Sequence, residues 1–333
     1  MIDLWFGIIA FLWTGYFVLE GFDFGVGLLS PFVSRDGDEQ RQSLQTIGPV
    51  WDGNEVWLIT AVGAMFAAFP AWYAGVFSTF YLPVVLVLVG LIMRGVGLEW
   101  RGKVADPGWC DLGIVVGSAL PAFLWGAVFA NLVLGSALAA VVGGLFTLAL
   151  CVLHGAVFLA LRTDGPVRRR ARVAALAAGA VTLPLAVVAL SGLAFGRAGR
   201  AGDAGGVGGM SGLSGAVEAG AAFDARSVPA LAAVGALAAA VALIWRRREG
   251  WAFAATATAI ALTSVSVFTA LRVAPLPGLT LAEAASGPYT MTMLTWIGLI
   301  ALPFVLLYQG WTYWVFRKRV GVTRQPAPQP AAY

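Results

Sequence analysis

The sequence predicts an all-α integral membrane protein with nine transmembrane helices, on the evidence of composition, segment length and charge distribution. Of the 333 residues, 59% are hydrophobic and 11% are charged, with a mean hydropathy of +0.84. Soluble domains carry roughly 25% charged residues, so the composition excludes a water-soluble fold. Nine stretches each contain about 20 apolar residues or more, the length that spans a bilayer as a helix.

We expect the nine spans near residues 4–29, 54–73, 74–98, 112–135, 138–161, 172–195, 228–245, 251–273 and 289–316. The second and third are the hardest to separate. Phe69-Pro70, followed by Gly75, predicts a short turn between them.

The distribution of basic residues predicts the orientation. Most of the 21 lysines and arginines follow odd-numbered spans. The exceptions, on the other side, are Arg197, Arg200, Arg226 and Arg272. Because cytoplasmic loops are enriched in Lys and Arg, we expect the N-terminus outside and the C-terminus in the cytoplasm.

We expect residues 1–320 to form a single polytopic membrane domain. The Gly- and Ala-rich stretch 196–227 is typical of an external flexible loop, and residues 321–333 are expected to be a disordered cytoplasmic tail. Trp311, Tyr313 and Trp314 precede Arg317-Lys318-Arg319, which predicts an aromatic belt followed by basic anchors at the inner surface.

Several classes of site are disfavoured. Cys110 and Cys151 lie far apart without CxxC spacing, which argues against a zinc site, an iron–sulfur cluster or a disulfide framework. The net charge of +4 fits loops that face anionic lipid, and we expect no binding of nucleic acid. The chain shows no phosphate-binding loop and no nucleophile–base motif.

Asp52 and Glu55 open the second span and stand three residues apart, so a helix places both on one face. A charged group in a bilayer costs roughly 2.5–3.5 kcal/mol on insertion scales, which favours a functional role. The alternative is that both acids lie at the membrane surface and cap the helix, since acids favour a helix's first turn.

Other intramembrane charges fall at the same depth. Glu20 and Asp23 lie in the cytoplasmic half of the first span, and Arg94 and Glu99 lie near the inner end of the third. Buried carboxylates that hold protons near neutral pH can form a proton path from the cytoplasm. The alternative is a structural network of salt bridges, with Arg94 paired to Glu99 or Asp52.

His154 is the sole histidine, on the fifth span. A haem held by this chain would need a second ligand, with methionine as the available type. The candidates are Met65, Met93, Met291 and Met293. We favour a packed, hydrogen-bonded histidine.

Tryptophans and glycines of the early spans allow two further interpretations. The tryptophans either flank a quinone ring or pack in the core, and packing is favoured; they are Trp13, Trp57, Trp72 and Trp125. Gly21, Gly25 and Gly27 are typical of sites where helices approach closely.

Several motifs together resemble subunit II of the cytochrome bd-type quinol oxidases. Two signature stretches carry the resemblance, EGFDFGVG at residues 20–27 and GPVWDGNEVWLIT at residues 48–60. Further matches are FAAFP at 66–70, RGVGLE at 94–99, WRGK at 100–103, MLTW at 293–296 and PFVLLY at 303–308. The similarity covers the first hundred residues and the last forty-five, while the middle agrees mainly in helix count.

The resemblance implies a nine-helix subunit, two four-helix bundles plus one helix, in a bacterial plasma membrane. Its partner would be subunit I, which in this family carries two b-type haems and one d-type haem and oxidises quinol. No haem would be ligated here. The complex reduces dioxygen to water with protons from the cytoplasm and generates proton motive force without pumping. Small single-helix accessory subunits are usual, and some members hold a structural quinone in subunit II.

The resemblance further implies a proton-conducting role for Asp52, with Trp51, Glu20, Asp23 and Arg94 beside it. Their depth in the membrane adds Glu55 and Glu99 to the predicted path. Trp51, Asn54 and Trp57 belong to the same motif as supporting residues. Glu20 stands where other members carry Asp, and Glu55 stands where some carry an uncharged residue. Two other functions remain open: a proton-coupled secondary transporter using the same carboxylates, and a purely structural scaffold for a haem-bearing partner.

Overall fold

The computed structural model describes residues 1–195, 227–273 and 275–321. Helices make up the fold within these ranges, and two isolated β-bridges join loop residues. The helices are α1 (Ile2–Val33), α2 (Gly37–Gln45), α3 (Trp51–Ala68), α4 (Pro70–Thr79), α5 (Tyr81–Trp100), α6 (Gly108–Leu134), α7 (Ala137–Arg162), α8 (Gly165–Phe195), α10 (Val228–Trp245), α11 (Glu249–Val273), α12 (Leu281–Ala284) and α13 (Pro288–Val315). The expected loop at 196–227 and tail at 321–333 lie outside the described residues, apart from Ser227 and Gly321.

Eight helices in the described part of the chain are long and apolar enough to cross a membrane: α1, α5, α6, α7, α8, α10, α11 and α13. They coincide with eight of the nine expected spans. The expected second span, 54–73, is divided between α3 and α4, so its prediction as one continuous helix is wrong. The third span begins at Tyr81 rather than near residue 74.

The break between α3 and α4 has a local cause. Phe69 adopts φ −136° and ψ 66°, outside the helical region, and Pro70 follows as the first residue of α4. Proline disfavours a helical residue before it and is accommodated in a helix's first turn, where its missing N–H is not needed. The predicted turn at Phe69-Pro70 is thus confirmed, whereas Gly75 lies inside α4.

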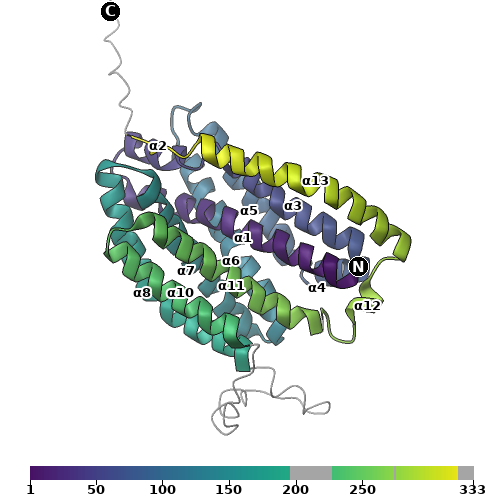
Figure 1. The fold of residues 1–333 in the computed structure, drawn as a ribbon. Helices are drawn as coiled ribbons and strands as arrows, with labels where there is room; N and C mark the ends of the chain where they lie inside the picture. The colour runs from purple at the N-terminus through teal and green to yellow at the C-terminus, as the bar shows by residue number, and fades with distance from the viewer. Residues whose placement is uncertain (196–226, 274, 322–333) are drawn as a thin grey trace, which may run out of the picture.

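The first helix lies at the centre of the molecule (Figure 1). It packs against α3, α6, α7 and α11. At one side of the bundle, α13 lies along α3; at the opposite side, α8 and α10 lie together (Figure 1). Since α1 contacts elements of both halves, the division into two four-helix bundles plus one stays a prediction.

Glycines allow α1 to lie this close to its neighbours. A Cβ at Gly25 would lie 2.0 Å from the carbonyl oxygen of Cys151 and 2.7 Å from the Cα of Gly155 on α7. A Cβ at Gly27 would lie 2.2 Å from the Ser118 hydroxyl on α6. The predicted close approach is confirmed at these two positions but not at Gly21, where the nearest atom would be 3.8 Å away.

Aromatic side chains fill the core beside the first half of α1. The ring centroids of Trp13 and Trp125 lie 4.9 Å apart, and the Trp125 indole N–H donates to the Tyr16 hydroxyl at 3.2 Å. Trp57 and Trp72 are likewise buried, with 6% and 1% exposure. Packing, the favoured interpretation of the four tryptophans, therefore describes all of them.

Gly25→Ala should destabilise the protein by about 1–3 kcal/mol, because the added methyl group has no room against the α7 backbone. Gly7→Ala is the matched control in the same helix, since a Cβ at Gly7 meets no atom within 4 Å. Thermal unfolding of the purified protein in detergent measures both. Equal melting temperatures for the two variants would contradict the close α1–α7 contact.

Candidate functional site

A buried arginine joins three helices near one end of the bundle. The side chain of Arg94, on α5, is fully buried and forms an ion pair with the equally buried Glu20 of α1. The same guanidinium nitrogen lies 3.5 Å from a carboxylate oxygen of Glu55 on α3. The Arg94 guanidinium carbon also lies 4.9 Å from the ring centroid of Phe24, so the charge rests against an aromatic face.

Small residues bring the backbone of α5 against α6 and so fix the height of Arg94. A Cβ at Gly117 of α6 would lie 2.6 Å from the Arg94 backbone nitrogen, and a Cβ at Gly97 would lie 2.7 Å from the Cys110 carbonyl oxygen. The glycines hold the backbones of α5 and α6 in contact. From this position the long Arg94 side chain extends to α1, where it pairs with Glu20.

Asn54 is the second centre of the site and connects α1, α3 and α13. Its side-chain NH₂ donates to the Asp23 carboxylate at 2.7 Å, and its side-chain oxygen accepts from Gln309 at 3.0 Å and from the Tyr313 hydroxyl at 2.8 Å. Asn54 and Asp23 are both fully buried. With a further bond to the Leu19 carbonyl oxygen at 3.4 Å, four hydrogen bonds fix the Asn54 amide, and one of them orients the Asp23 carboxylate.

Several polar atoms of the cluster have no hydrogen-bond partner among the described residues. They are Oε2 of Glu20, Oδ1 of Asp23, and Nε and Nη1 of Arg94. Buried polar groups are ordinarily hydrogen-bonded to protein or to ordered water. The carboxylate oxygens accept hydrogen bonds and the guanidinium nitrogens donate them, so a small number of internal waters could bond to both.

The cluster extends to the surface through the first turns of α3. The side chain of Glu55 is 22% exposed, and Asp52, one turn earlier, is exposed. Trp51 is half-buried, and its ring centroid lies 5.9 Å from the Arg94 guanidinium carbon. Carboxylates thus run from the exposed end of α3 to the buried acids of α1.

Glu99 does not join this cluster. Its side chain is 60% exposed and lies 3.5 Å from the Lys103 ammonium group, one turn along the chain. The alternative pairing of Arg94 with Glu99 or Asp52 is wrong, because the partners of Arg94 are Glu20 and Glu55. Trp57, expected as a supporting residue, packs its ring against α1 at Gly15, where an added Cβ would lie 2.2 Å from the ring.

Sequence reasoning missed Gln309 and identified Tyr313 only as part of an aromatic belt. Tyr313 instead points inward to Asn54, whereas Trp311 and Trp314 are 60% and 61% exposed, as a belt requires. The signal was available: Gln309 is a polar residue inside an apolar helix, and Tyr313 stands four residues later on the same face.

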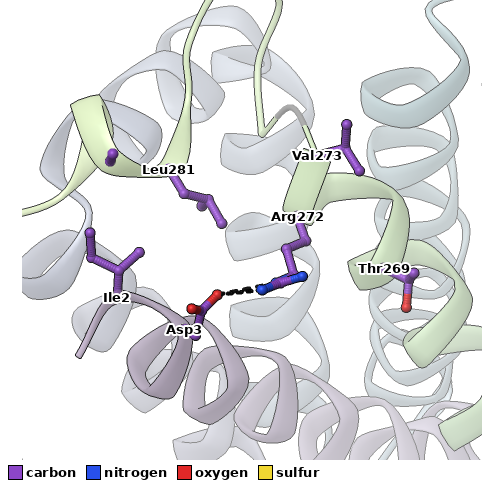
Figure 2. Close-up of a pocket in the computed structure, with 7 residues that line it drawn as sticks. Ile2, Asp3, Thr269, Arg272, Val273 and Leu281 are labelled. Atoms are coloured by element: carbon purple, nitrogen blue, oxygen red, sulfur yellow. Dashed lines mark hydrogen bonds and ion pairs between the residues drawn. The ribbon is translucent and has the colours of Figure 1, made fainter.

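A separate pocket lies at the other end of the bundle, between the start of α1, the end of α11 and α12 (Figure 2). Its volume is about 410 Å³. Figure 2 shows the Arg272 guanidinium directed at the Asp3 carboxylate across it, at 2.7 Å. Asp3 precedes Glu20 by more than four helical turns, so the pocket has no connection to the acid cluster.

Comparison with known proteins places the chain in a family. The family described as Cytochrome bd terminal oxidase subunit II matches residues 1–316. The chain belongs to this family. Cytochrome bd ubiquinol oxidase subunit 2 of Bacillus subtilis (strain 168) is 37% identical over 345 residues, covering 96% of each chain. Cytochrome bd-I ubiquinol oxidase subunit 2 of Escherichia coli (strain K12) is 31% identical over 357 residues, covering 95% of this chain and 94% of the relative.

A solved structure supports the fold. The bd oxidase from Geobacillus thermodenitrificans matches with a TM-score of 0.73 and 17% identity over 95% of this chain and 99% of that one. As a cytochrome bd subunit II, the chain is a multi-pass membrane protein and a component of an oxidoreductase complex that includes a subunit I and haem.

The surroundings of His154 do not fit a haem ligand. His154 is fully buried and both ring nitrogens are engaged, one with the Thr256 hydroxyl at 2.7 Å and the other with the Val18 carbonyl oxygen at 3.1 Å. Its ring also stacks on Phe253 with centroids 4.7 Å apart. No nitrogen is left for iron, and His154 is the packed, hydrogen-bonded residue that the sequence favoured. The described residues contain no group of three or more His, Cys, Asp or Glu side chains placed to hold a metal.

Arg94→Gln should destabilise the protein by about 3–5 kcal/mol, because Glu20 would keep a buried charge without its partner. The double variant Glu20→Gln/Arg94→Gln removes both charges and should recover much of that loss. Thermal unfolding of the assembled complex measures this coupling. Additive losses in the double variant would contradict a direct buried ion pair.

Proposed function

We propose that this chain conducts protons from the cytoplasm toward the oxygen-reducing haem of subunit I. In this proposal the complex oxidises quinol, reduces dioxygen to water and generates proton motive force without pumping, in a bacterial plasma membrane. The observation that carries the proposal is the group of acids at one end of the bundle. Asp52 is exposed, Glu55 and the buried Glu20 both pair with Arg94, and the buried Asp23 lies nearly one turn from Glu20 on α1.

Charge balance supports proton binding within the series. Glu20, Asp23 and Glu55 surround a single guanidinium, Arg94. If all three carboxylates were ionised, a mostly buried site would hold more negative than positive charge, which a low-dielectric interior strongly disfavours. A bound proton restores the balance, and its transfer between neighbouring acids needs only short movements of water and carboxyl groups.

The direction of transfer follows from exposure and from the basic residues. The exposed member, Asp52, lies at the end of the bundle that carries most of the arginines, which the positive-inside rule assigns to the cytoplasm. Protons would therefore enter at Asp52 and reach Glu20 and Asp23 in the interior.

The outer surface of α3 and α13 is the docking face that we propose for subunit I. Only Met291 of α13 is buried, and many of the large apolar side chains of this helix are exposed. A carboxylate that faces lipid is costly, so the partly exposed Glu55 calls for a protein neighbour. Accessory single-helix subunits and a structural quinone remain expectations of the family resemblance.

The two alternative functions, a secondary transporter and a structural scaffold, predict different properties. A secondary transporter acting alone would need a substrate site at mid-membrane depth, with broken helices in paired halves. A haem-bearing second subunit that co-purifies with the chain would count against it. A structural scaffold would use the same ion pairs only to hold helices together. A substitution of an acid that belongs to none of these ion pairs therefore distinguishes a scaffold from a proton conductor.

Asp52→Asn is the test that separates conduction from assembly, because Asp52 is exposed and forms no ion pair among the described residues. The variant complex should keep its thermal stability and haem content. Proton uptake and oxygen turnover should fall roughly a hundredfold, the lower end of what a positioned acid–base group contributes.

Glu99→Gln is the matched control, since Glu99 is an exposed acid near the same end but pairs with Lys103 outside the cluster. Its turnover should equal that of the unsubstituted complex. If Asp52→Asn leaves both rates unchanged, conduction through Asp52 is wrong. A loss of stability at normal rates would support the helix-capping interpretation instead.

A further inference from the structure

The turn between α10 and α11 presents three consecutive arginines to the surroundings. Arg246, Arg247 and Arg248 are all exposed. None of the three side chains forms an ion pair or a hydrogen bond with another described residue. They lie at the arginine-rich end of the bundle, where α10 ends and α11 begins.

The acid nearest in sequence is already occupied. Glu249 is 5% exposed and accepts from the Nε of Arg172 at 2.6 Å, while a guanidinium nitrogen of Arg168 lies 3.3 Å from the same carboxylate. Both arginines come from α8, so Glu249 serves to tie α8 to α11. The turn therefore keeps its full positive charge.

The backbone conformation of the turn disfavours an arginine at its centre. Arg247 has φ +58°, and it is the one non-glycine residue with positive φ in the described part of the chain. The Arg248 N–H bonds to the Leu243 carbonyl at 2.9 Å and the Arg247 N–H to the Ile244 carbonyl at 3.0 Å, the Schellman pattern that ends a helix. Glycine is the usual residue at this left-handed position because it has no Cβ to strain. The chain keeps a charged side chain where glycine would be more stable.

Two exposed tryptophans flank the turn. Trp245 is 79% exposed and Trp251 is 68% exposed. Indole rings at such positions lie at the level of the lipid headgroups. The turn also lies on the α8–α10 side, across the bundle from α3 and α13, so the docking face proposed for subunit I leaves it open to lipid (Figure 1).

We propose that the α10–α11 turn, residues 245–251, binds the phosphate headgroup of an anionic phospholipid. The three guanidinium groups supply the charge and the hydrogen-bond donors that phosphate oxygens accept. The two indole rings lie beside the glycerol and upper acyl region. The site is independent of the proposed proton path, since it shares no residue with it.

The test compares the intact complex in vesicles of phosphatidylcholine with vesicles that also contain phosphatidylglycerol. Spin-labelled phosphatidylglycerol and phosphatidylcholine report the relative association of each lipid with the protein. Arg246→Gln, Arg247→Gly and Arg248→Gln should each lower the preference for phosphatidylglycerol about fivefold, since a basic residue near an anionic surface contributes on this scale. Lys103→Gln, which removes an exposed charge paired with Glu99, should leave the preference unchanged.

Arg247→Gly allows a second measurement, the melting temperature, beside the lipid preference. If the turn were only structural, this substitution would change the melting temperature without changing the lipid preference. It should raise the melting temperature in pure phosphatidylcholine, because glycine relieves the left-handed strain, while it weakens the phosphatidylglycerol preference. An unchanged lipid preference in all three arginine variants would overturn the proposal. So would effective competition by inorganic phosphate, which would indicate a site for a small free anion.

Discussion

The ion pair between Arg94 and Glu20 is the constraint on which the rest of this structure depends. Both side chains are fully buried, and each charge alone would carry a desolvation penalty of several kcal/mol in a low-dielectric interior. The pair forms only if α1 and α5 are held at one relative height. Glycine contacts between α5 and α6, and between α1 and α7, supply that fixed geometry.

The same constraint explains why polar groups far apart in the sequence converge. Once Glu20 faces Arg94, Asp23 lies nearly one turn further along α1 and needs its own partner, which Asn54 provides. Asn54 in turn needs donors for its oxygen, and Gln309 and Tyr313 of α13 supply them. A single buried charge thus organises hydrogen bonds across four helices. Several polar atoms of the cluster are left without a hydrogen-bond partner among the described residues, and in the proposed proton path these are the atoms that would exchange protons with internal water.

Much of this arrangement could be predicted from the sequence. Spans and charges are local features, so the depth of Glu20, Asp23 and Arg94 followed from their positions in apolar segments. Glu99 was assigned to the path by depth alone. A spacing of five residues from Arg94 puts it on another face of α5, where it pairs with Lys103. The roles of Gln309 and Tyr313 required the tertiary contact between α3 and α13, which no local pattern contains. The break at Phe69 was indicated by Pro70, but hydropathy alone could not place the short α4 after it.

We propose that the buried carboxylates change protonation while the complex reduces oxygen. Infrared difference spectroscopy of the assembled complex, reduced against oxidised, measures this directly through the carbonyl stretch of protonated carboxyl groups. The account predicts a carboxyl band that shifts or disappears between the two states, and that is altered in Glu20→Gln or Asp23→Asn. A spectrum without any carboxyl change, or a band unaffected by both substitutions, would contradict proton transfer through this cluster.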